Sequence, residues 1–334
     1  MRLLLLGGTA WLGGVLATIA VRRGHQVTCL ARGESGAAPP GVRFVRADRD
    51  GPDPFREIAD ETFDAVIDVS RQPGQVRTAV AALADRVGHA VFVSSGNVYA
   101  DHSVPGADER APLLEPLAGD VMADMESYGP AKVACERHVL AGFGAGRCLI
   151  ARAGLIGGPG DVSDRTGYWP LRFARPALAD GRVLVPDAPD APTQVIDVRD
   201  LAGWLLTAAE TGRSGIFDVV GETVALATHL ATARAVAGHT GAVVAVGTQR
   251  LLDCAVEPWM GERSLPLWLP DPGYQGFCAR TGAAARAAGL VTRPLTETLA
   301  DVLAWELGRQ PHQPRRAGLS DQEERDLLAV LTVD

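Results

Sequence analysis

Residues 2–14 read RLLLLGGTAWLGG, in which four leucines are followed at once by a glycine-rich turn. The apolar run 3–6 predicts a short buried parallel strand, and apolar residues at helical spacing follow over 12–23. Glycines at a strand-to-helix turn let the backbone approach a pyrophosphate, which the first N–H groups of the helix bind. The stretch therefore predicts a dinucleotide site, although a bare loop can have the same composition. Its candidate cofactor-binding residues are Gly7, Thr9, Ala10, Trp11, Leu12 and Gly13.

Strands and helices alternate along the chain. Strands are predicted at 3–6, 26–31, 42–47, 65–69, 90–94 and 147–152, and helices at 12–23, 55–60, 75–86 and about 127–141. This alternation predicts an α/β fold of the Rossmann type with a doubly wound parallel sheet. After about residue 159 proline and glycine become frequent, and shorter strands are predicted at 182–185, 195–197, 216–220 and 242–246. We expect a dinucleotide-binding domain over 1–158 with sheet elements returning around 193–220, a smaller substrate-binding lobe over 159–308, and a tail over 309–334 with a short helix at 321–331.

Lys132 is the only lysine of the chain, although lysine and arginine together number 32. It follows Tyr128 by four residues, so the two side chains would leave the same face of a helix. Arginine does not replace lysine where a compact ammonium must lie beside a phenol. A nearby ammonium favours the phenolate of a tyrosine, which makes the phenol a general acid and base. The pair therefore predicts proton transfer at an alcohol or carbonyl oxygen, whereas most chance pairs of this spacing lie on a solvated helix face.

Polar residues follow the buried strand predicted at 90–94. Ligands of an open parallel sheet bind beyond the carboxyl ends of its strands, so Ser95 is placed to hydrogen-bond a substrate oxygen. Asn97, the only asparagine of the chain, is a candidate substrate contact. Serine and asparagine are also common in turns, and a turn role stays open for both residues.

Five motifs resemble those of short-chain dehydrogenases/reductases of the extended, epimerase/dehydratase-like type. They are the glycine-rich turn, Ser94-Ser95-x-x-Val98-Tyr99, Tyr128-x-x-x-Lys132, the strand and loop over 152–160, and the segment 195–202. The resemblance covers residues 1–210 and implies a catalytic triad of Ser95, Tyr128 and Lys132. In that triad Tyr128 would pass the proton, Lys132 would bind the nicotinamide ribose and favour the phenolate, and Ser95 would polarise a carbonyl.

Three departures from the family pattern reduce the number of reactions that the sequence is compatible with. Ala10 replaces the middle glycine of Gly-x-x-Gly-x-x-Gly, and Gly96 stands where dehydratases place an acid. Residues 193–194 are Thr-Gln, where nucleotide-sugar epimerases commonly carry an arginine for the sugar diphosphate. The pattern favours an NAD(P)-dependent oxidoreductase that moves a hydride between nicotinamide and a carbonyl or secondary alcohol. An epimerase of a sugar or polyol with tightly bound NAD, and a catalytically silent dinucleotide-sensing or binding protein, are the alternatives.

The end of the second predicted strand bears on the choice of cofactor. An acid at this place accepts hydrogen bonds from the ribose 2′-hydroxyl of NAD. The chain instead has Arg32, whose charge favours a 2′-phosphate, followed by Glu34. We expect NADP to be preferred, with NAD as the alternative. Asp48 matches the acid that faces adenine in relatives, and Ser70 and Ser94, at two further strand ends, complete the candidate cofactor residues.

The lobe should determine the substrate, because its aromatic residues follow directly on the cofactor loop. Aromatic side chains can line a pocket for a ring-containing molecule, but they are as often core. The candidate substrate contacts, besides Asn97, are Tyr168, Trp169 and Gln194. Arg165 and Arg172 are expected at the surface, with pairing to a substrate anion as the alternative.

Charge and composition argue against several functions. A net charge of −8 disfavours a nucleic-acid surface, which would be basic. The 5 cysteines and 7 histidines show no ligand spacing, so we expect no metal and reduced thiols in a bacterial cytoplasm. The apolar start is too short for a signal peptide or membrane span. We expect a small-molecule substrate and, from the resemblance, a homodimer formed through the helix at 127–141.

Overall fold

A parallel sheet forms the centre of the larger domain in the computed structural model, which describes residues 1–309 and 315–331. Within these residues the sheet has seven strands in the order β10-β6-β5-β4-β1-β2-β3. The strands are β1 (Arg2–Leu6), β2 (Gln26–Ala31), β3 (Arg43–Arg46), β4 (Phe63–Asp68), β5 (Val87–Ser95), β6 (Cys148–Ala153) and β10 (Gly215–Val219). The order runs outward from β1 in both directions, which confirms the predicted doubly wound α/β fold.

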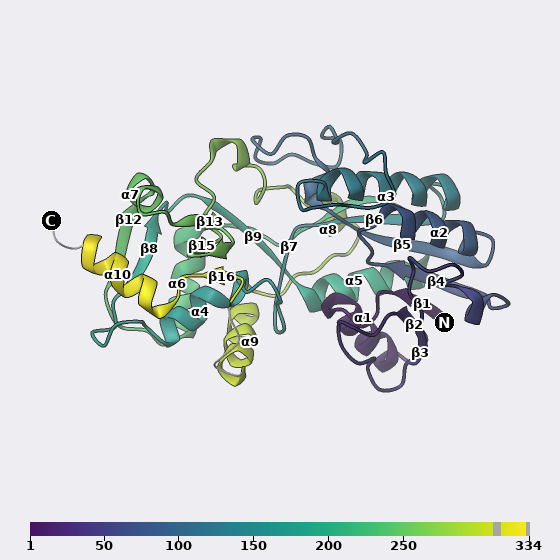
Figure 1. Ribbon diagram of the computed structural model, residues 1–334, viewed down its shortest axis with the longest axis horizontal. Coiled ribbons are helices and arrows are strands. Elements are labelled where there is room, and N and C mark those ends of the chain that lie inside the picture. The colour runs from purple at the N-terminus through teal and green to yellow at the C-terminus, as the bar shows by residue number, and fades with distance from the viewer. Residues whose placement is uncertain (310–314, 332–334) are drawn as a thin grey trace.

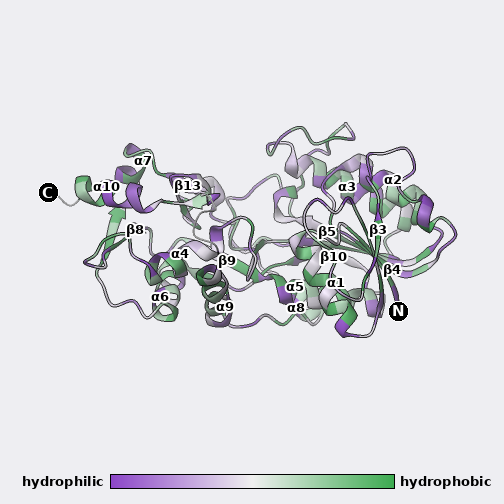
Figure 2. Cartoon of the chain, turned by 60° about the horizontal axis from the view of Figure 1, so that its bottom comes forward, coloured by the Kyte–Doolittle hydropathy of each residue, from purple (hydrophilic) through white to green (hydrophobic). Residues whose placement is uncertain are grey.

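Helices cover both faces of this sheet (Figure 1). One face carries α1 (Trp11–Arg22) and α5 (Val198–Thr211), and the other carries α2 (Pro73–Leu83) and α3 (Tyr128–Phe143). Successive side chains of a strand point to opposite faces, so Leu3 and Leu5 of β1 enter one apolar cluster and Leu4 and Leu6 enter the other. Hydrophobic residues accordingly gather along the strands and on the helix faces that cover them (Figure 2).

A smaller lobe follows β6 and lies beside the carboxyl ends of the strands (Figure 1). Its strands are β7 (Leu155–Gly157), β9 (Pro192–Asp197) and β11 (Thr223–Ala225) in one sheet, with β8 (Val183–Asp187) and β12 (Val243–Gly247) paired beside it. Its helices are α4 (Arg165–Ala174), α6 (Leu226–Val236), α7 (Thr248–Asp253) and α9 (Leu295–Gly308). Short strands β13 (Glu257–Trp259), β14 (Gly261–Glu262), β15 (Ser264–Pro266) and β16 (Ala317–Gly318) complete it, whereas α8 (Ala283–Ala287) packs on β10.

The C-terminal segment is part of the lobe core, which corrects the prediction of a separate tail. The helix predicted at 321–331 is observed as α10 (Asp321–Leu331), and its Leu327 and Leu328 lie in the same apolar cluster as α4 and β8. Glu324 is fully buried, accepts a hydrogen bond from the Leu184 N–H at 2.8 Å and pairs with Arg172 at 3.0 Å. Residues 310–314 and 332–334 of the predicted tail lie outside the described residues.

Two further observations complete the fold. The helix predicted at 55–60 is observed as a 3-10 turn, η1 (Arg56–Ile58). Within the described residues no helix combines the length and apolar character needed to cross a bilayer.

Candidate functional site

The turn between β1 and α1 requires glycine at its two ends. Gly7 has a φ of +93°, and a Cβ there would lie 2.7 Å from Val69 Cγ2. A Cβ on Gly13 would lie 2.2 Å from the carbonyl oxygen of Gly7, so this glycine lets α1 pack on the turn. Ala10 occupies the N-cap with an extended backbone (φ −76°, ψ 165°), a conformation that its methyl group tolerates. The first turn of α1 has no acidic residue, so its N–H groups suit an anion.

A cavity of about 420 Å³ opens beside this turn, at the carboxyl ends of β1, β2, β3 and β4. This is where ligands of open α/β sheets bind, and the volume lies within the range of small-molecule sites. The predicted cofactor residues among its lining are Gly7, Thr9, Ala10, Arg32, Asp48 and Ser70. The glycine turn, the free helix N-terminus and this cavity together fit a dinucleotide.

Two predicted cofactor residues of the cavity also have partners within the protein. Arg32 pairs with Glu34 at 3.4 Å, and both side chains are more than half exposed, at 55% and 65%. Asp48 accepts a hydrogen bond from the N–H of Asp50 at 3.1 Å, which is a turn interaction. Each side chain still reaches the cavity, so neither partner prevents contact with a nucleotide.

The side chain of Trp11 holds a loop of the lobe rather than lining the cavity. Its Nε1 donates a hydrogen bond to the carbonyl oxygen of Pro159 at 2.9 Å. A Cβ on Gly160 would lie 2.9 Å from the same Nε1, so the loop after β7 passes directly over the indole. Trp11 thereby fixes the lobe against the start of α1.

An ion pair that the sequence analysis missed lies in the wall of the cavity. Arg49 donates to both carboxylate oxygens of Asp68 at 2.8 Å and to the carbonyl oxygen of Gln75 at 2.7 Å. Asp68 also accepts a hydrogen bond from the N–H of Ser70 at 2.8 Å, which positions the segment after β4. The signal available in the sequence was an acid at the last position of a buried strand, but its partner is distant in the sequence.

Lys132 and Tyr128 lie on the same face of α3, as their spacing predicts. The Lys132 side chain is 3% exposed, and its Nζ donates to the carbonyl oxygens of Ser70 and Val93 at 2.7 Å each. The Nζ lies 4.8 Å from the centre of the Phe92 ring and 6.0 Å from the centre of the Tyr128 ring. The ammonium therefore joins α3 to the ends of β4 and β5 and keeps a positive charge beside the phenol.

Ser95 closes β5 and makes a turn interaction with Asn97. Its Oγ donates to Asn97 Oδ1 at 2.9 Å and accepts from the Asn97 N–H at 3.2 Å, which caps the 3-10 turn η2 (Gly96–Val98). The alternative of a turn role is thus observed for both residues. Ser95 nevertheless lies at the strand end, two residues after Val93, whose carbonyl oxygen binds Lys132, and its membership of a triad with Tyr128 and Lys132 stays a prediction.

Ser94, predicted to bind the cofactor, is instead part of a buried polar network. Its Oγ donates to Glu136 at 2.5 Å, and Glu136 forms a bidentate pair with Arg152 at 3.0 and 2.8 Å. Arg152 also donates to the Tyr99 hydroxyl at 3.1 Å. Successive residues of a strand face opposite ways, so Ser94 and Ser95 cannot both point toward a ligand.

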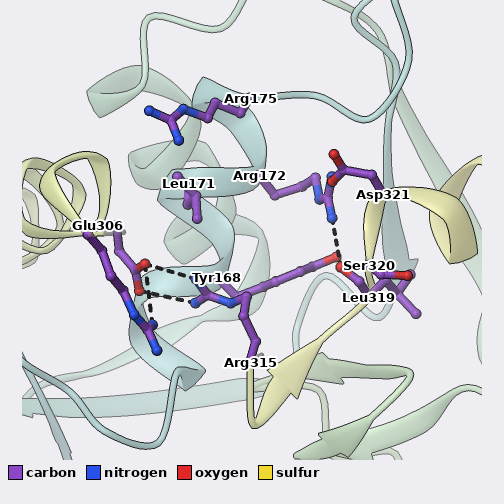
Figure 3. Close-up of a pocket in the computed structure, with 10 residues that line it drawn as sticks. Tyr168, Leu171, Arg172, Arg175, Glu306, Arg315, Leu319, Ser320 and Asp321 are labelled. Carbon is purple, nitrogen blue, oxygen red and sulfur yellow. Dashed lines mark hydrogen bonds and ion pairs between the residues drawn. The ribbon is translucent and has the colours of Figure 1, made fainter. Parts of the chain in front are cut away.

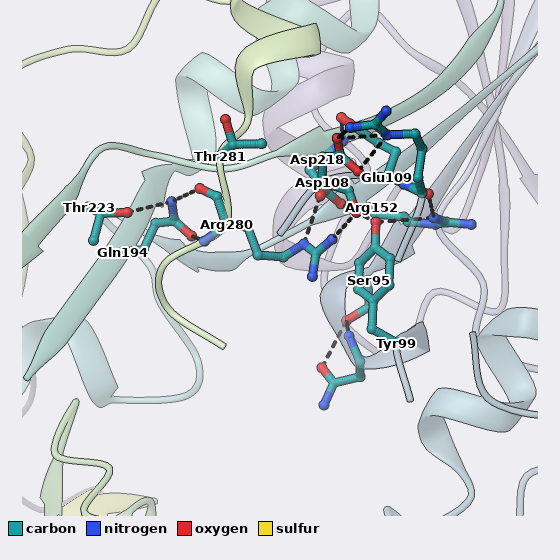
Figure 4. Close-up of polar contacts among 12 residues, drawn as sticks. Ser95, Tyr99, Asp108, Glu109, Arg152, Gln194, Asp218, Thr223, Arg280 and Thr281 are labelled. Carbon is teal, nitrogen blue, oxygen red and sulfur yellow. Dashed lines mark hydrogen bonds and ion pairs between the residues drawn. The ribbon is translucent and has the colours of Figure 1, made fainter. Parts of the chain in front are cut away.

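The same network reaches the lobe and accounts for Gln194. The Tyr99 hydroxyl donates to Asp218 at 2.6 Å, and Asp218 pairs with Arg280 at 2.7 Å. Gln194, which is 3% exposed, donates to Thr223 Oγ1 at 2.9 Å and to the carbonyl oxygen of Arg280 at 2.8 Å (Figure 4). The prediction of a substrate contact at Gln194 is therefore wrong, because its buried amide is bound to β11 and to the backbone of Arg280.

The predicted substrate contacts Tyr168 and Trp169 are also wrong. They are 2% and 0% exposed and pack in the lobe core, where Trp169 Nε1 donates to the carbonyl oxygen of Pro266 at 2.8 Å. Tyr168 borders a cavity of about 320 Å³ that the tail also lines, and none of the predicted catalytic residues lines it (Figure 3). Arg172, at the same cavity, is buried and paired with Asp321 and Glu324, so it is not a surface residue.

Arg165 belongs to the lobe and lies near Tyr128 of the larger domain. It is the first residue of α4, and it is near enough to Tyr128 for a Tyr128 phenolate to raise its pKa. Among residues 1–309 and 315–331, no three His, Cys, Asp or Glu side chains are grouped as a metal site would need. The absence of a metal stays a prediction.

Comparison with known protein families assigns the larger domain, including the glycine turn and the Tyr128–Lys132 pair, to one family. The model of the family described as "NAD dependent epimerase/dehydratase family" matches residues 3–221. The chain belongs to this family. Its members are NAD-dependent enzymes that include epimerases, dehydratases and reductases. The resemblance that the motifs indicated is thereby confirmed.

Individual relatives are more distant. A 2'-dehydrokanamycin reductase of Streptomyces kanamyceticus is 32% identical over 161 residues, which cover 47% of this chain and 43% of that protein. A putative epimerase of Burkholderia cenocepacia superimposes with a TM-score of 0.68 at 23% identity, over 92% of this chain and 98% of the other. The UDP-glucuronic acid 4-epimerase of Bacillus cereus, solved in complex with NAD, gives a TM-score of 0.65 at 13% identity, over 92% and 100%. At these identities the solved structures show the fold alone.

Proposed function

We propose that this protein is an NADP-dependent reductase or dehydrogenase of a small carbonyl compound or secondary alcohol, with Tyr128 as general acid and base. The observation that carries the proposal is the buried Lys132 ammonium, held by the carbonyl oxygens of Ser70 and Val93 beside the Tyr128 ring. A buried lysine is costly unless its charge is used or paired, and here it lies next to the group that must lose and regain a proton.

Tyr128, Lys132 and Ser95 have different roles at the reacting oxygen of the substrate. The cavity beside the glycine turn would hold a nicotinamide nucleotide, which would supply or accept the hydride at the substrate carbon. Tyr128 gives its proton to the carbonyl oxygen as the alcohol forms, and it takes the proton back in the reverse direction. Lys132 favours the phenolate that remains, and Ser95, released from Asn97 by a bound substrate, donates a hydrogen bond to the same oxygen.

Two features favour a reductase over the other reactions of the family. Position 96 is a glycine, so the acid that water elimination would need is missing there. A Cβ at this position would contact only the Ala153 carbonyl oxygen, at 3.8 Å, so there is room for a side chain and the glycine is not required by packing. Gln194 takes the place of the diphosphate-binding arginine, and nearby Arg280 is already paired with Asp218. The weak similarity to a reductase points in the same direction.

The NADP preference rests on Arg32. Its guanidinium reaches the cavity at the end of β2 from a largely exposed position, where it can exchange Glu34 for a 2′-phosphate. Several solved structures of the same fold were determined with NAD, so a preference for NADP has to be tested directly against NAD.

The test compares Tyr128→Phe with the wild type, using NADPH oxidation with a panel of ketones. We expect the variant to bind NADPH normally and to lose about 10²- to 10⁴-fold in kcat, the usual contribution of general acid catalysis. Tyr274→Phe is the matched control, because that ring is 43% exposed and lies outside the predicted triad. Unchanged turnover in Tyr128→Phe would refute the proton role.

The nucleotide carried by the purified protein separates a reductase from an epimerase. A reductase releases its cofactor in every turnover, so we expect weak, exchangeable binding with a preference for NADPH. Stoichiometric NAD⁺ that does not exchange would overturn the proposal in favour of the epimerase.

A further inference from the structure

Arg165 has an unusual environment at the boundary between the lobe and the catalytic residues. Its Nε donates to Ser163 Oγ at 3.1 Å, and its guanidinium lies 5.0 Å from the centre of the Trp259 ring. Burial lowers the pKa of this guanidinium, while the nearby Asp161, Cys278 and Tyr128 act in the opposite direction. Arginine remains charged even so, which places a partly desolvated cation close to Tyr128.

The charge of Arg165 has no carboxylate partner among the described residues. Four arginines whose side chains are at most 7% exposed each have one: Arg49 pairs with Asp68, Arg152 with Glu136, Arg172 with Glu324 and Arg280 with Asp218, whereas Arg165 is only half-buried. In the part of the chain that the structure describes, only Nε of the Arg165 guanidinium donates a hydrogen bond, so both Nη groups are available to bind another molecule. Asp161 lies near Arg165 but forms no ion pair with it, and a partly desolvated cation without a paired carboxylate is unfavourable, which is a reason to expect that a ligand supplies one.

The guanidinium of Arg165 packs against the indole ring of Trp259. Trp259 has a left-handed backbone with φ of +69°, a conformation that is strained for a bulky side chain and is concentrated at functional sites. Its ring packs edge-on against Phe277 at 5.5 Å, and Phe277 in turn contacts His102 at 5.0 Å. Phe277 thus packs against the indole of Trp259, and the indole packs against the guanidinium of Arg165.

We propose that Arg165 binds a carboxylate of the substrate, so that the natural substrate is a ring-containing keto acid or hydroxy acid whose reacting oxygen lies at Tyr128. This inference rests on the proposed function and specifies the substrate class of the same site. The two free Nη groups form the donor pair that a carboxylate accepts in a bidentate manner.

A single carboxylate fits this site better than a phosphate dianion or an ammonium group. Asp161 lies near Arg165 and is 2% exposed, so the local positive charge is partly balanced and a second negative charge on the ligand would be poorly neutralised. A substrate with ammonium groups at this end would be repelled by the guanidinium. During the reaction the carbonyl carbon gains the hydride, the carbonyl oxygen gains the Tyr128 proton, and the carboxylate is unchanged.

The experiment compares benzoylformate with its uncharged methyl ester, both as substrates of the NADPH-loaded protein. We expect the wild type to prefer the acid at least tenfold in kcat/KM. Arg165→Gln should lower kcat/KM for the acid by about 10- to 100-fold, mainly through KM, and should leave the ester unchanged, because one charged hydrogen-bonded contact is removed. Arg165→Lys, which keeps the charge but loses the paired donors, should be intermediate.

Arg175→Gln is the matched control, because Arg175 caps the other end of α4 and its side chain is exposed. It should retain the wild-type preference. A wild-type preference for the ester, or an Arg165→Gln variant that still prefers the acid, would overturn the inference.

A binding measurement separates this inference from the proposed function. Benzoylformate is titrated calorimetrically into the NADP⁺-loaded Tyr128→Phe protein, with and without Arg165→Gln. Binding that needs Arg165 supports the carboxylate site even if Tyr128 proves not to be the proton donor. Absence of binding, or binding that is equal in both proteins, refutes the site even if turnover confirms the role of Tyr128.

Discussion

Removing one member of the buried Glu136–Arg152 pair should destabilise the protein severely. The two side chains are 3% and 2% exposed and are joined by two hydrogen bonds of 3.0 and 2.8 Å. Glu136→Gln leaves the guanidinium without a counterion, and Arg152→Met leaves the carboxylate with only the Ser94 hydroxyl at 2.5 Å.

The expected loss is about 3–5 kcal/mol in the free energy of unfolding for each single variant, the usual result of leaving a buried charge unpaired. Since a domain is stable by only about 5–15 kcal/mol, either variant should unfold at a much lower urea concentration than the wild type. The double variant Glu136→Gln/Arg152→Met removes both charges. It should recover about 1–3 kcal/mol relative to the sum of the singles, because contacting residues are coupled.

Urea unfolding followed by circular dichroism measures all four proteins. Asp120→Asn is the surface control: it breaks the Arg77–Asp120 pair, whose side chains are both 54% exposed, and it should leave the midpoint unchanged. A single variant that unfolds at the wild-type midpoint would contradict this prediction, and so would a double variant in which the two losses simply add.

Three further predictions follow from other sites. Burial lowers the pKa of His229 from 6.5 to about 4, so on acidification the unfolded chain takes up a proton before the folded protein does. The free energy of unfolding should therefore fall as the pH falls from 6.5 towards 4. His229→Gln should make the urea midpoint less dependent on pH in this range, and an equally steep decline in the variant would contradict the prediction. Arg32→Ala should raise the KM for NADPH about tenfold and leave that for NADH unchanged, because a charged contact to the 2′-phosphate is lost; equal effects on both nucleotides would show that Arg32 does not select the cofactor. Glu324→Ala should lower the unfolding free energy by about 3 kcal/mol, since Arg172 loses a buried partner and the Leu184 N–H loses its acceptor; a wild-type melting profile would restore the idea of an independent tail.

The parts of the site that sequence reasoning predicted are local ones. Tyr128 and Lys132 are four residues apart on one helix, and Gly7 and Gly13 belong to one turn, so period and turn chemistry place them without knowledge of the rest of the chain. The sequence prediction was wrong where a residue's partner is distant in the sequence. The Gln194 amide is occupied by Thr223 and Arg280, whose positions depend on how the lobe folds back.

The same limit explains the lobe. Tyr168 and Trp169 follow the cofactor loop directly, and aromatic residues there serve equally well as core or as pocket wall. Packing of α4 against α9 and α6 turned these two rings inward. Arg165, one helical turn before Tyr168, is half-buried near Tyr128, although the sequence predicted it at the surface.

The sequence by itself determined the doubly wound sheet, the glycine turn and the Tyr128–Lys132 pair, because strand period, helix period and turn chemistry act over a few residues. The tertiary structure alone decided which charges are compensated. It paired Arg49, Arg152, Arg172 and Arg280 with acids and left Arg165 without one among the described residues. The physical reason is that charge pairing inside a protein depends on distances of a few ångströms between elements far apart in the sequence, and the pattern of residues along the chain does not contain those distances.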